Sequence, residues 1–294
     1  MVRQLGIVGC GLMGGSFALA LKRHGLVQRV VGFSRSPSTT EHALRMGVID
    51  VAAESALRAV AGCDVVLVAV PVAATEATLR SIRDLVAPDV LVMDVGSTKR
   101  DVVEAAERAL GERLGSFVPA HPIAGKEAAG IEHADGTLYA GRQVILTPLP
   151  ASRPEMVQKA TDLWAAIGAR VLTMTPEHHD AAFAAVSHLP HLLAFAYFGA
   201  VAAQPARRDL LALAGPGFRD FTRIAASDPV VWRDILLANR DEVLQQSQRF
   251  RHALDAFEAA MRAGDAQALE ALIRGVARER AQWQMSGPPG PPAR

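Results

Sequence analysis

A glycine-rich segment, LGIVGCGLMGGS beginning at Leu5, constrains the fold of this chain more than any other feature. Gly9, Gly11 and Gly14 form a G-x-G-x-x-G pattern between an apolar strand-like run and a helix-compatible run at 17–21. This context is typical of a dinucleotide-binding turn. We expect the first glycine to allow the tight turn, the second to let the backbone approach a pyrophosphate, and the third to let helix and strand pack closely. The helix N-terminus would attract the phosphates. A plain strand–helix turn is the alternative.

Strand-like and helix-like segments alternate through the first part of the chain. The runs at 64–70 and 90–95 are continuously apolar, as in strands that are buried on both faces of a parallel sheet. Further strands are expected at 29–34, 117–120, 143–147 and 170–174, and helices at 38–46, 75–86, 100–110 and 154–167. This alternation predicts an α/β, Rossmann-type doubly wound sheet in a dinucleotide-binding domain over residues 1–174.

The character of the sequence changes at about Pro176. Helical stretches rich in Ala and Leu follow at 181–203, 229–263 and 266–284. They predict an all-helical domain over residues 175–286. Because so much apolar helix lies in a short segment, we expect part of it to be buried against a second copy of the chain. Residues 287–294, which read GPPGPPAR, predict a disordered tail.

Composition excludes several classes of partner. The 294 residues carry 31 basic and 30 acidic side chains, a net charge of +1, with no long run of one sign. We therefore expect neither nucleic-acid nor membrane binding. Cys10 and Cys63 lack metal-ligand spacing and are expected to be buried thiols. The N-terminus reads as a first strand and helix rather than a signal peptide, which predicts a cytoplasmic protein.

The end of the second predicted strand favours NADP as the cofactor. An NAD-preferring domain carries an Asp or Glu there, about 20 residues beyond the turn, for the ribose hydroxyls. This chain has Ser34, Arg35 and Ser36, which suit a ribose 2′-phosphate. The alternative is that Arg35 is solvated and that both NADP and NAD bind. The full set of expected cofactor-binding residues is Gly9, Gly11, Leu12, Met13, Gly14, Ser34, Arg35, Ser36, Val70 and Pro71.

Two patches follow predicted strands in the first domain. Ser97 lies at the carboxyl end of a strand, where ligands bind in open α/β sheets. Ser97 or Thr98 could instead cap the next helix, with Asp101 completing a capping box from Thr98. His121 follows a strand between two prolines and titrates ordinarily near ~6.5, so it could accept a proton at neutral pH. A surface histidine is the alternative.

Two further patches lie in the helical part. Four of the nine histidines fall within residues 178–191. Their spacing matches no zinc motif, and Pro190 interrupts the local helix, so binding of an anionic substrate is favoured and no metal is expected. Arg219 and Arg223 lie four residues apart, so one helical face could present both to a carboxylate. Solvated surface arginines are the alternative.

Together these patches resemble the prephenate/arogenate (cyclohexadienyl) dehydrogenase family. The resemblance runs from Leu5 to Trp283 and rests on GCGLMGGS, VGSTKRD, HPIAGKE, HHD with SHLPH, and GFRDFTRIAASDPVVWRD, in that order. It implies a Rossmann-type domain followed by an all-helical dimerisation domain, and therefore a homodimer. It also implies oxidative decarboxylation of prephenate and/or arogenate to an aromatic ring, with hydride transfer to NAD or NADP, in tyrosine biosynthesis.

The resemblance also implies roles for individual residues. His121 corresponds to the catalytic base that takes the proton of the ring hydroxyl, and Ser97 to its partner on the same hydroxyl. Arg223 corresponds to the main ligand of a substrate carboxylate. The other implied substrate-site residues are His188 and His191, which line the site, His179 near the nicotinamide, Trp232 near the substrate side chain, and Lys126. Many relatives carry Thr in place of Lys126, so the choice between prephenate and arogenate stays open, with a lysine expected to repel the ammonium of arogenate.

Two other functions compete with this interpretation. A β-hydroxyacid dehydrogenase also joins a Rossmann domain to a helical one, but it uses a lysine of the second part, and residues 176–286 contain none. A non-catalytic NADP-sensing protein would have no need for His121, Ser97 and Arg223 together.

Overall fold

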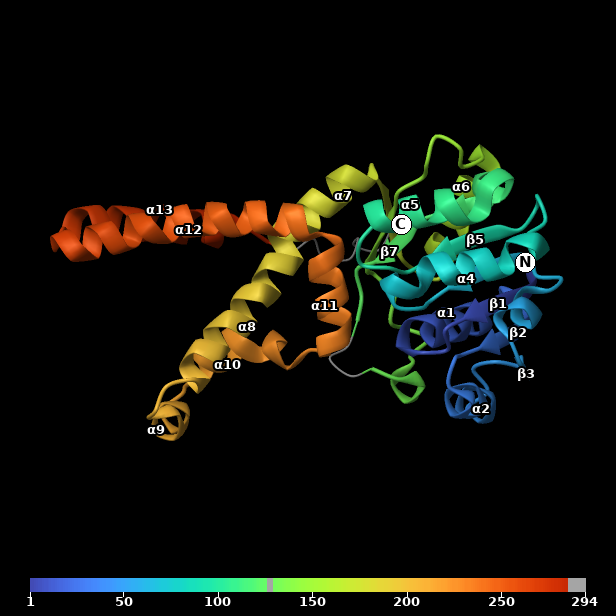
Figure 1. Ribbon diagram of the computed structural model, residues 1–294, viewed down its shortest axis with the longest axis horizontal. Coiled ribbons are helices and arrows are strands. Elements are labelled where there is room, and N and C mark those ends of the chain that lie inside the picture. The colour runs from blue at the N-terminus through green and yellow to red at the C-terminus, as the bar shows by residue number, and fades with distance from the viewer. Residues whose placement is uncertain (126–128, 285–294) are drawn as a thin grey trace, which may run out of the picture.

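The computed structural model describes residues 1–125 and 129–284 of the chain. An α/β domain is followed by a helical domain that extends away from it (Figure 1). The predicted domain boundary at 174/175 falls between the last strand, which ends at Thr173, and helix α7, which begins at Pro176. Lys126 and the predicted tail at 287–294 lie outside the described residues.

Six parallel strands form the main sheet, in the order β3-β2-β1-β4-β5-β6. Their bounds are Val2–Val8 (β1), Val27–Phe33 (β2), Val51–Ala52 (β3), Val65–Val68 (β4), Leu91–Asp94 (β5) and Phe117–Val118 (β6). The strand order reverses at β1, which lies between β2 and β4. This is the switch point at which doubly wound sheets bind their ligands.

The last three predicted strands do not all join this sheet. Strands β7 (Ala120–Pro122), β8 (Gln143–Leu146) and β9 (Arg170–Thr173) form a second sheet, in which β7 runs antiparallel to β8. Pro119 separates β6 from β7 and has no N–H for a ladder. Its carbonyl oxygen accepts a hydrogen bond from Thr147 at 3.0 Å. His121 therefore lies inside a short buried strand, whereas the sequence places it in a loop after one.

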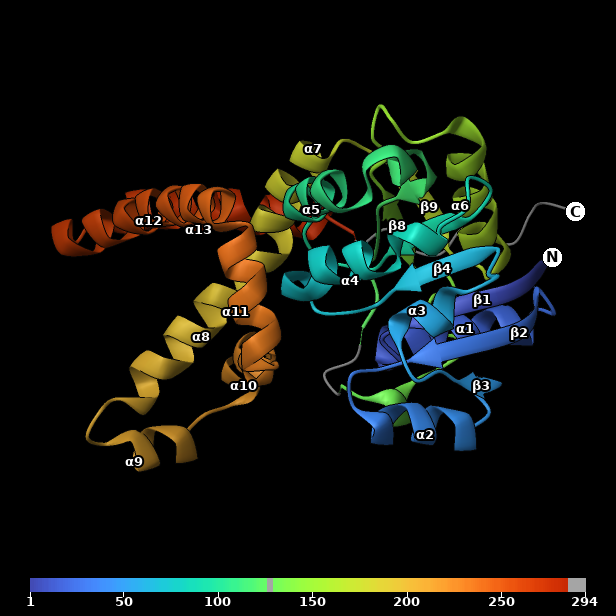
Figure 2. The ribbon, with the colours of Figure 1, turned by 45° about the vertical axis from the view of Figure 1, so that its right-hand side comes forward.

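Helices cover both faces of the main sheet (Figure 2). Their bounds are Leu12–Arg23 (α1), Pro37–Arg45 (α2), Ala56–Val60 (α3), Thr75–Ile82 (α4), Arg100–Leu110 (α5) and Pro154–Ala166 (α6). Alternate residues of β4 point to two separate apolar clusters: Leu67 packs with Phe17 and Trp164, whereas Val66 and Val68 pack with α4 and α5. Burial on both faces explains why the strands read as continuous apolar runs.

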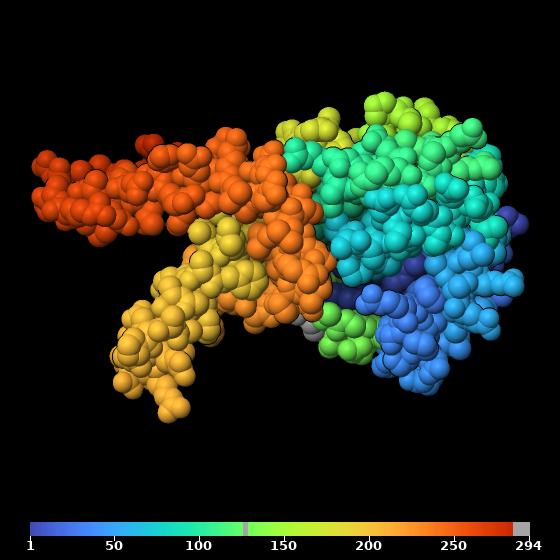
Figure 3. Space-filling view, in the orientation of Figure 1, coloured from blue at the N-terminus to red at the C-terminus, as the bar shows by residue number. Residues whose placement is uncertain are grey.

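The second domain is helical, as predicted. Its helices are Pro176–Phe183 (α7), Leu189–Ala202 (α8), Arg207–Ala212 (α9), Pro216–Thr222 (α10), Pro229–Ala238 (α11), Arg240–Ala263 (α12) and Ala266–Gln282 (α13). A π-helical turn, Ala184–His188, joins α7 to α8, and Pro190 occupies the first turn of α8 rather than interrupting a helix. Helices α12 and α13 form an arm that stands clear of the α/β domain (Figure 3).

Candidate active site

The predicted dinucleotide-binding turn, residues 9–14, has the backbone geometry that the sequence predicts. Gly9 has a φ of 104°, and a Cβ there would lie 2.2 Å from the carbonyl oxygen of Ala69. A Cβ on Gly14 would lie 2.3 Å from the carbonyl oxygen of Gly9, so α1 packs against the turn too closely for a side chain. At Gly11, the N-cap of α1, a Cβ would meet no atom within 4 Å. This open approach to a helix N-terminus fits the diphosphate of a dinucleotide.

The residues after β2 divide into one that supports the turn and two that face solvent. The hydroxyl of Ser34 accepts a hydrogen bond from the backbone N–H of Cys10 at 2.8 Å, and thus ties the turn to β2. Arg35 and Ser36 are exposed beside it. Leu12 and Met13 form the first turn of α1, and Val70 and Pro71 follow β4. These residues surround the switch point and fit a bound dinucleotide.

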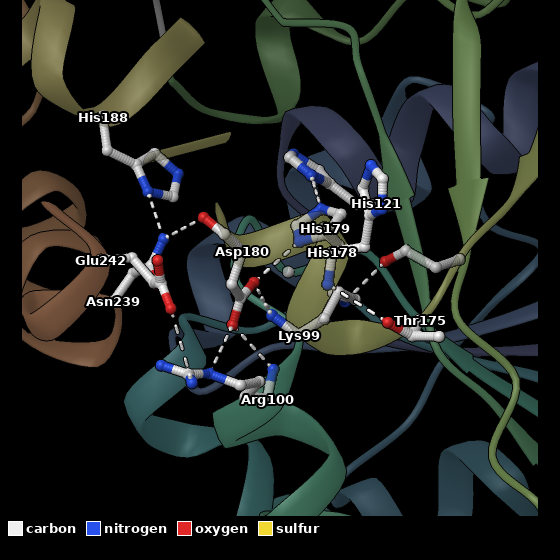
Figure 4. A network of polar contacts seen from close by, with 12 residues as sticks. Lys99, Arg100, His121, Thr175, His178, His179, Asp180, His188, Asn239 and Glu242 are labelled. Carbon is white, nitrogen blue, oxygen red and sulfur yellow. Dashed lines mark hydrogen bonds and ion pairs between the residues drawn. The ribbon is translucent and has the colours of Figure 1, made fainter. Parts of the chain in front are cut away.

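His121 belongs to a buried chain of hydrogen bonds that crosses between the domains (Figure 4). Its Nδ1 lies 2.8 Å from Nε2 of His179, and Nδ1 of His179 lies 2.8 Å from Oδ1 of Asp180. His179 and Asp180 are at most 1% exposed. The ring of Phe183 packs against both imidazoles, with centroid distances of 4.9 Å to His121 and 4.5 Å to His179.

The polarity of this chain follows from Asp180. An ionised carboxylate only accepts, so Nδ1 of His179 must carry its proton. Neutral His179 then has a bare Nε2, which accepts from Nδ1–H of His121. Because His121 is also neutral, its Nε2 keeps a lone pair. The arrangement presents an imidazole that can take up a proton at Nε2.

Asp180 also caps helix α5. Its Oδ1 and Oδ2 accept hydrogen bonds from the backbone N–H groups of Lys99 and Arg100, at 2.8 and 2.9 Å. The sequence instead offers Ser97 or Thr98 as a local cap, but the N-cap residue is Lys99, and its own side chain makes no capping hydrogen bond. A carboxylate at a helix N-terminus is stabilised by the helix dipole. This cap ties α7 of the helical domain to α5 of the α/β domain.

A buried ion pair lies behind His121. Nζ of Lys99 lies 2.5 Å from Oδ2 of Asp94 and donates to the carbonyl oxygen of Ala120 at 2.8 Å. The other carboxylate oxygen of Asp94 accepts from the backbone N–H of Ala120 at 3.0 Å. Both charged side chains are at most 2% exposed. The ion pair therefore holds both backbone polar groups of Ala120, the residue that precedes His121.

His188 is held by a second buried contact. The side-chain nitrogen of Asn239 donates to the carbonyl oxygen of Asp180 at 2.8 Å and lies 3.0 Å from Nδ1 of His188. A carbonyl oxygen only accepts, so this nitrogen is the NH₂ group and His188 accepts at Nδ1. Neutral His188 then carries its proton on Nε2 and can donate it. His121 and His188 thus offer opposite hydrogen-bonding character.

His191 lies at the outer side of the cluster. Its Nδ1 donates to the carbonyl oxygen of Ser187 at 2.9 Å, and its ring stacks on Trp232 with centroids 3.5 Å apart. Arg223 lies near enough to act on His191 electrostatically. The structure therefore stacks His191 on Trp232 and places Arg223 within electrostatic range of His191. Arg219 pairs with Asp220 at 3.0 Å on α10, whereas Arg223 begins the following 3₁₀ turn, so the two arginines do not share one α-helix.

Burial keeps the imidazoles neutral. It holds the pKa of His121 well below 6.5, with further lowering by His179, Lys99 and His188. Burial also lowers the pKa of His179, and it lowers the pKa of His188 to about 4. Burial acts to raise the pKa of Asp180, but hydrogen bonds from His179 and the α5 N–H groups outweigh it and lower that pKa. The imidazoles of the site are therefore neutral, and the ionised carboxylate of Asp180 lies at the end of their hydrogen-bond chain.

Ser97 lies half-buried on the loop between β5 and α5, two residues before Lys99. The sequence does not single out Asp180, Lys99, Asp94, Asn239 or Phe183, although each contacts a predicted site residue or its neighbour. Asp180 and Lys99 belong to the HHD and STKRD strings, but the hydrogen bonds from Lys99 and Arg100 to Asp180 join residues about 80 positions apart in the chain.

Over residues 1–125 and 129–284, no group of three or more His, Cys, Asp or Glu side chains is placed to hold a metal ion.

Comparison with known proteins identifies the family of both domains. Residues 17–173 match the family described as prephenate dehydrogenase, nucleotide-binding domain. Residues 175–275 match the family described as prephenate dehydrogenase, dimerization domain.

Individual relatives match over nearly the whole chain. The prephenate dehydrogenase of Bacillus subtilis is 35% identical over 268 residues, which cover 90% of this chain and 71% of that protein. The cyclohexadienyl dehydrogenase of Zymomonas mobilis is 31% identical and covers 90% of each chain. A crystal structure of prephenate dehydrogenase from Aquifex aeolicus, in complex with hydroxyphenyl propionate and NAD+, has a TM-score of 0.90 at 34% identity and covers 96% of this chain and 98% of that one.

Proposed function

The chain belongs to the prephenate dehydrogenase family, and we propose that His121 is its catalytic base. The family carries out oxidative decarboxylation linked to a nicotinamide cofactor in tyrosine biosynthesis, and this chain is an enzyme of that kind. The observation that carries the proposal for His121 is its hydrogen bond to His179, which occupies Nδ1 and leaves the Nε2 lone pair. A bound nicotinamide dinucleotide supplies the hydride acceptor.

The chemistry requires one proton acceptor on the protein. As hydride leaves the ring carbon that bears the hydroxyl, that hydroxyl becomes a carbonyl, and His121 takes its proton at Nε2. The forming carbonyl then accepts the electron pair released when the ring carboxylate leaves as carbon dioxide. The ring becomes aromatic, and the proton on His121 can return to the phenolic oxygen. General-base help of this kind is worth ~100- to 10,000-fold in rate.

The other site residues bind and orient the substrate in this proposal. Ser97 bonds the same ring hydroxyl, and Arg223 holds a substrate carboxylate beside His191 and Trp232. His188, with a proton on Nε2, donates a hydrogen bond within the site, and His179 holds His121 near the nicotinamide. A fixed guanidinium suits a dicarboxylate because a charge-assisted pair gives both affinity and direction.

We propose prephenate as the preferred substrate and NADP as the preferred cofactor. Support for prephenate comes from the names of the Bacillus and Aquifex relatives and from the positive charge of Lys126, which would repel the ammonium of arogenate. Support for NADP comes from Arg35, which is exposed at the end of β2 where no carboxylate stands. NAD stays the alternative cofactor.

We also propose a cytoplasmic homodimer, formed through the helical domain. The dimerization-domain match covers residues 175–275, and large apolar side chains are exposed on its helices. Among them are Tyr197, Phe198, Leu244, Leu254, Ile273 and Val276. By length and composition alone the run Pro176–Ala202 could cross a membrane, but it holds His179, Asp180 and His188 in buried bonds to the rest of the protein. A second copy is therefore a better cover for it than lipid.

One experiment tests the activity and both preferences. The purified full chain is given prephenate or arogenate with NAD or NADP, and cofactor reduction is followed spectroscopically. We expect the highest kcat/KM with prephenate and NADP. A higher kcat/KM with arogenate than with prephenate would contradict the proposed substrate preference. A higher kcat/KM with NAD than with NADP would contradict the proposed cofactor preference. Absence of reduction in all four mixtures would reject the proposed roles of the site residues.

A further inference from the structure

Asp180 occupies a position that connects three separate parts of the candidate site. Its carboxylate binds His179 and the N-terminus of α5, and its backbone carbonyl oxygen accepts from Asn239, which holds His188. The whole residue is 1% exposed. Its carboxylate is thus shielded from solvent and from any substrate, and can act on the reaction only through its neighbours.

We propose that Asp180 is a positioning residue that fixes, through His179, the nitrogen of His121 on which the proton is carried. This inference deepens the proposed function, because it rests on His121 acting as the base. The contacts that carry it are the two 2.8 Å hydrogen bonds from His121 to His179 and from His179 to Asp180.

The carboxylate decides the direction of both hydrogen bonds. With Asp180 ionised, both imidazoles carry hydrogen on Nδ1, and Nε2 of His121 is bare. If His179 instead carried its hydrogen on Nε2, it would donate to Nδ1 of His121. The proton of neutral His121 would then sit on Nε2, and the base would be blocked. The two backbone N–H groups of α5 hold the carboxylate in place, so it cannot turn away from His179.

The carboxylate also stabilises the product of proton transfer. When His121 takes up a proton, its positive charge lies at the end of a chain that leads to a buried negative charge. Burial in a low-dielectric setting makes that attraction stronger than it would be in water. An aspartate that orients a catalytic histidine in this way is worth ~10,000-fold in the serine-protease triad, where asparagine imposes the wrong tautomer.

The test compares Asp180→Asn with Glu242→Gln in the full-length protein. Glu242 is the matched control because it lies 3.8 Å from the Arg100 guanidinium, which also contacts Asp180 at 3.7 Å, and has no part in the imidazole chain. We expect Asp180→Asn to lower kcat ~100-fold or more with a much smaller change in KM. Glu242→Gln should change kcat by less than about threefold, as for a partly exposed ion pair.

Two further readouts separate positioning from a merely structural role. Loss of the carboxylate makes protonated His121 less stable, so the acid limb of the kcat/KM profile should move to lower pH in Asp180→Asn. Nitrogen-15 NMR of the histidine rings should show a bare Nε2 and a protonated Nδ1 on His121 in the wild-type protein, and a mixed or inverted pattern in the variant. The NMR measurement on the wild-type protein needs neither activity nor a stable variant.

Each outcome decides the matter. A lower kcat with a shifted acid limb and an altered His121 tautomer supports the proposal. An unchanged kcat, an equal loss in both variants, a loss without a shift of the acid limb, or a proton on Nε2 of wild-type His121 overturns it. If the wild-type protein fails to oxidise either substrate while the NMR pattern is as expected, the proposed function fails but the positioning of His121 by Asp180 stands.

Discussion

The ammonium of Lys99 and the carboxylate of Asp94 meet 2.5 Å apart, with both side chains almost completely buried. Removal of one partner from such a pair leaves an uncompensated charge in the interior. We expect Lys99→Met to lower the free energy of unfolding by about 3–5 kcal/mol, measured by urea denaturation. Lys22→Met is the control, because Lys22 and Asp50 form a partly exposed pair worth only about 0–1 kcal/mol. Equal losses in the free energy of unfolding for the two variants would show that the buried pair contributes no more to stability than the exposed pair.

His121→Asn should lower kcat by ~100- to 10,000-fold, because the amide cannot take up a proton. Substrate affinity, measured by isothermal titration calorimetry in the absence of turnover, should change little. His178→Asn is a suitable control, since His178 is exposed on the same helix as His179. Near-normal turnover of His121→Asn would remove this residue from the mechanism.

Arg223→Ala should act mainly on KM. A hydrogen bond to a charged group is worth about 1.5–3 kcal/mol, so we expect KM to rise by roughly 10- to 100-fold. Arg223→Lys should recover part of this loss, because an ammonium keeps the charge without the planar fork. Arg219→Ala, which removes a residue paired with Asp220, should leave KM near its wild-type value. A loss confined to kcat in Arg223→Ala would contradict a binding role.

Arg35→Ala should weaken NADP much more than NAD. The guanidinium is exposed beyond β2, where it can meet a ribose 2′-phosphate that NAD lacks. We expect the Kd for NADP to rise by roughly 10-fold or more, since a charged hydrogen bond of about 1.5–3 kcal/mol is lost. Fluorescence titration with each cofactor measures the difference. Equal Kd changes for both cofactors, or none, would show that Arg35 does not read the phosphate.

The pH dependence of kcat/KM follows from the lowered pKa of His121. In the proposed mechanism the reactive form of His121 is the neutral ring, and burial keeps this ring neutral to a lower pH than usual. We therefore expect kcat/KM to be flat from about pH 8 down to 6.5 and to fall only at lower pH, as the free enzyme's base becomes protonated. This expectation replaces the ordinary value of ~6.5 that the sequence alone suggests. An acid limb centred at or above 6.5 would mean that the ring is better solvated than the structure shows.

Sequence reasoning predicted the elements that are encoded locally. The strand–turn–helix around Gly9, the buried strands and the change to helices near Pro176 each depend on patterns within a few residues. The family resemblance also pointed to His121, His191, Arg223 and Trp232, which the structure places around one cluster of imidazoles.

What sequence reasoning missed depends on contacts between distant segments. Asp180 follows two histidines in the chain, but its carboxylate caps a helix that begins 80 residues earlier. Lys99 reads as a polar residue at a helix start, yet its side chain is buried against Asp94 and β7. The separate sheet of β7, β8 and β9 was not predicted. Pro119 follows β6 and its carbonyl oxygen accepts from Thr147, and this pairing with a distant segment is not visible in the local sequence.

The cap on α5 comes from the other domain, and this has a consequence for thermal behaviour. Unfolding of the helical domain would remove Asp180 and expose the first backbone N–H groups of α5. Unfolding of the α/β domain would leave the carboxylate of Asp180 without these donors. Unfolding of one domain should therefore destabilise the other domain. Because His121 and His179 come from the two domains and share this connection, we expect heating to disrupt their hydrogen bond as soon as either domain unfolds.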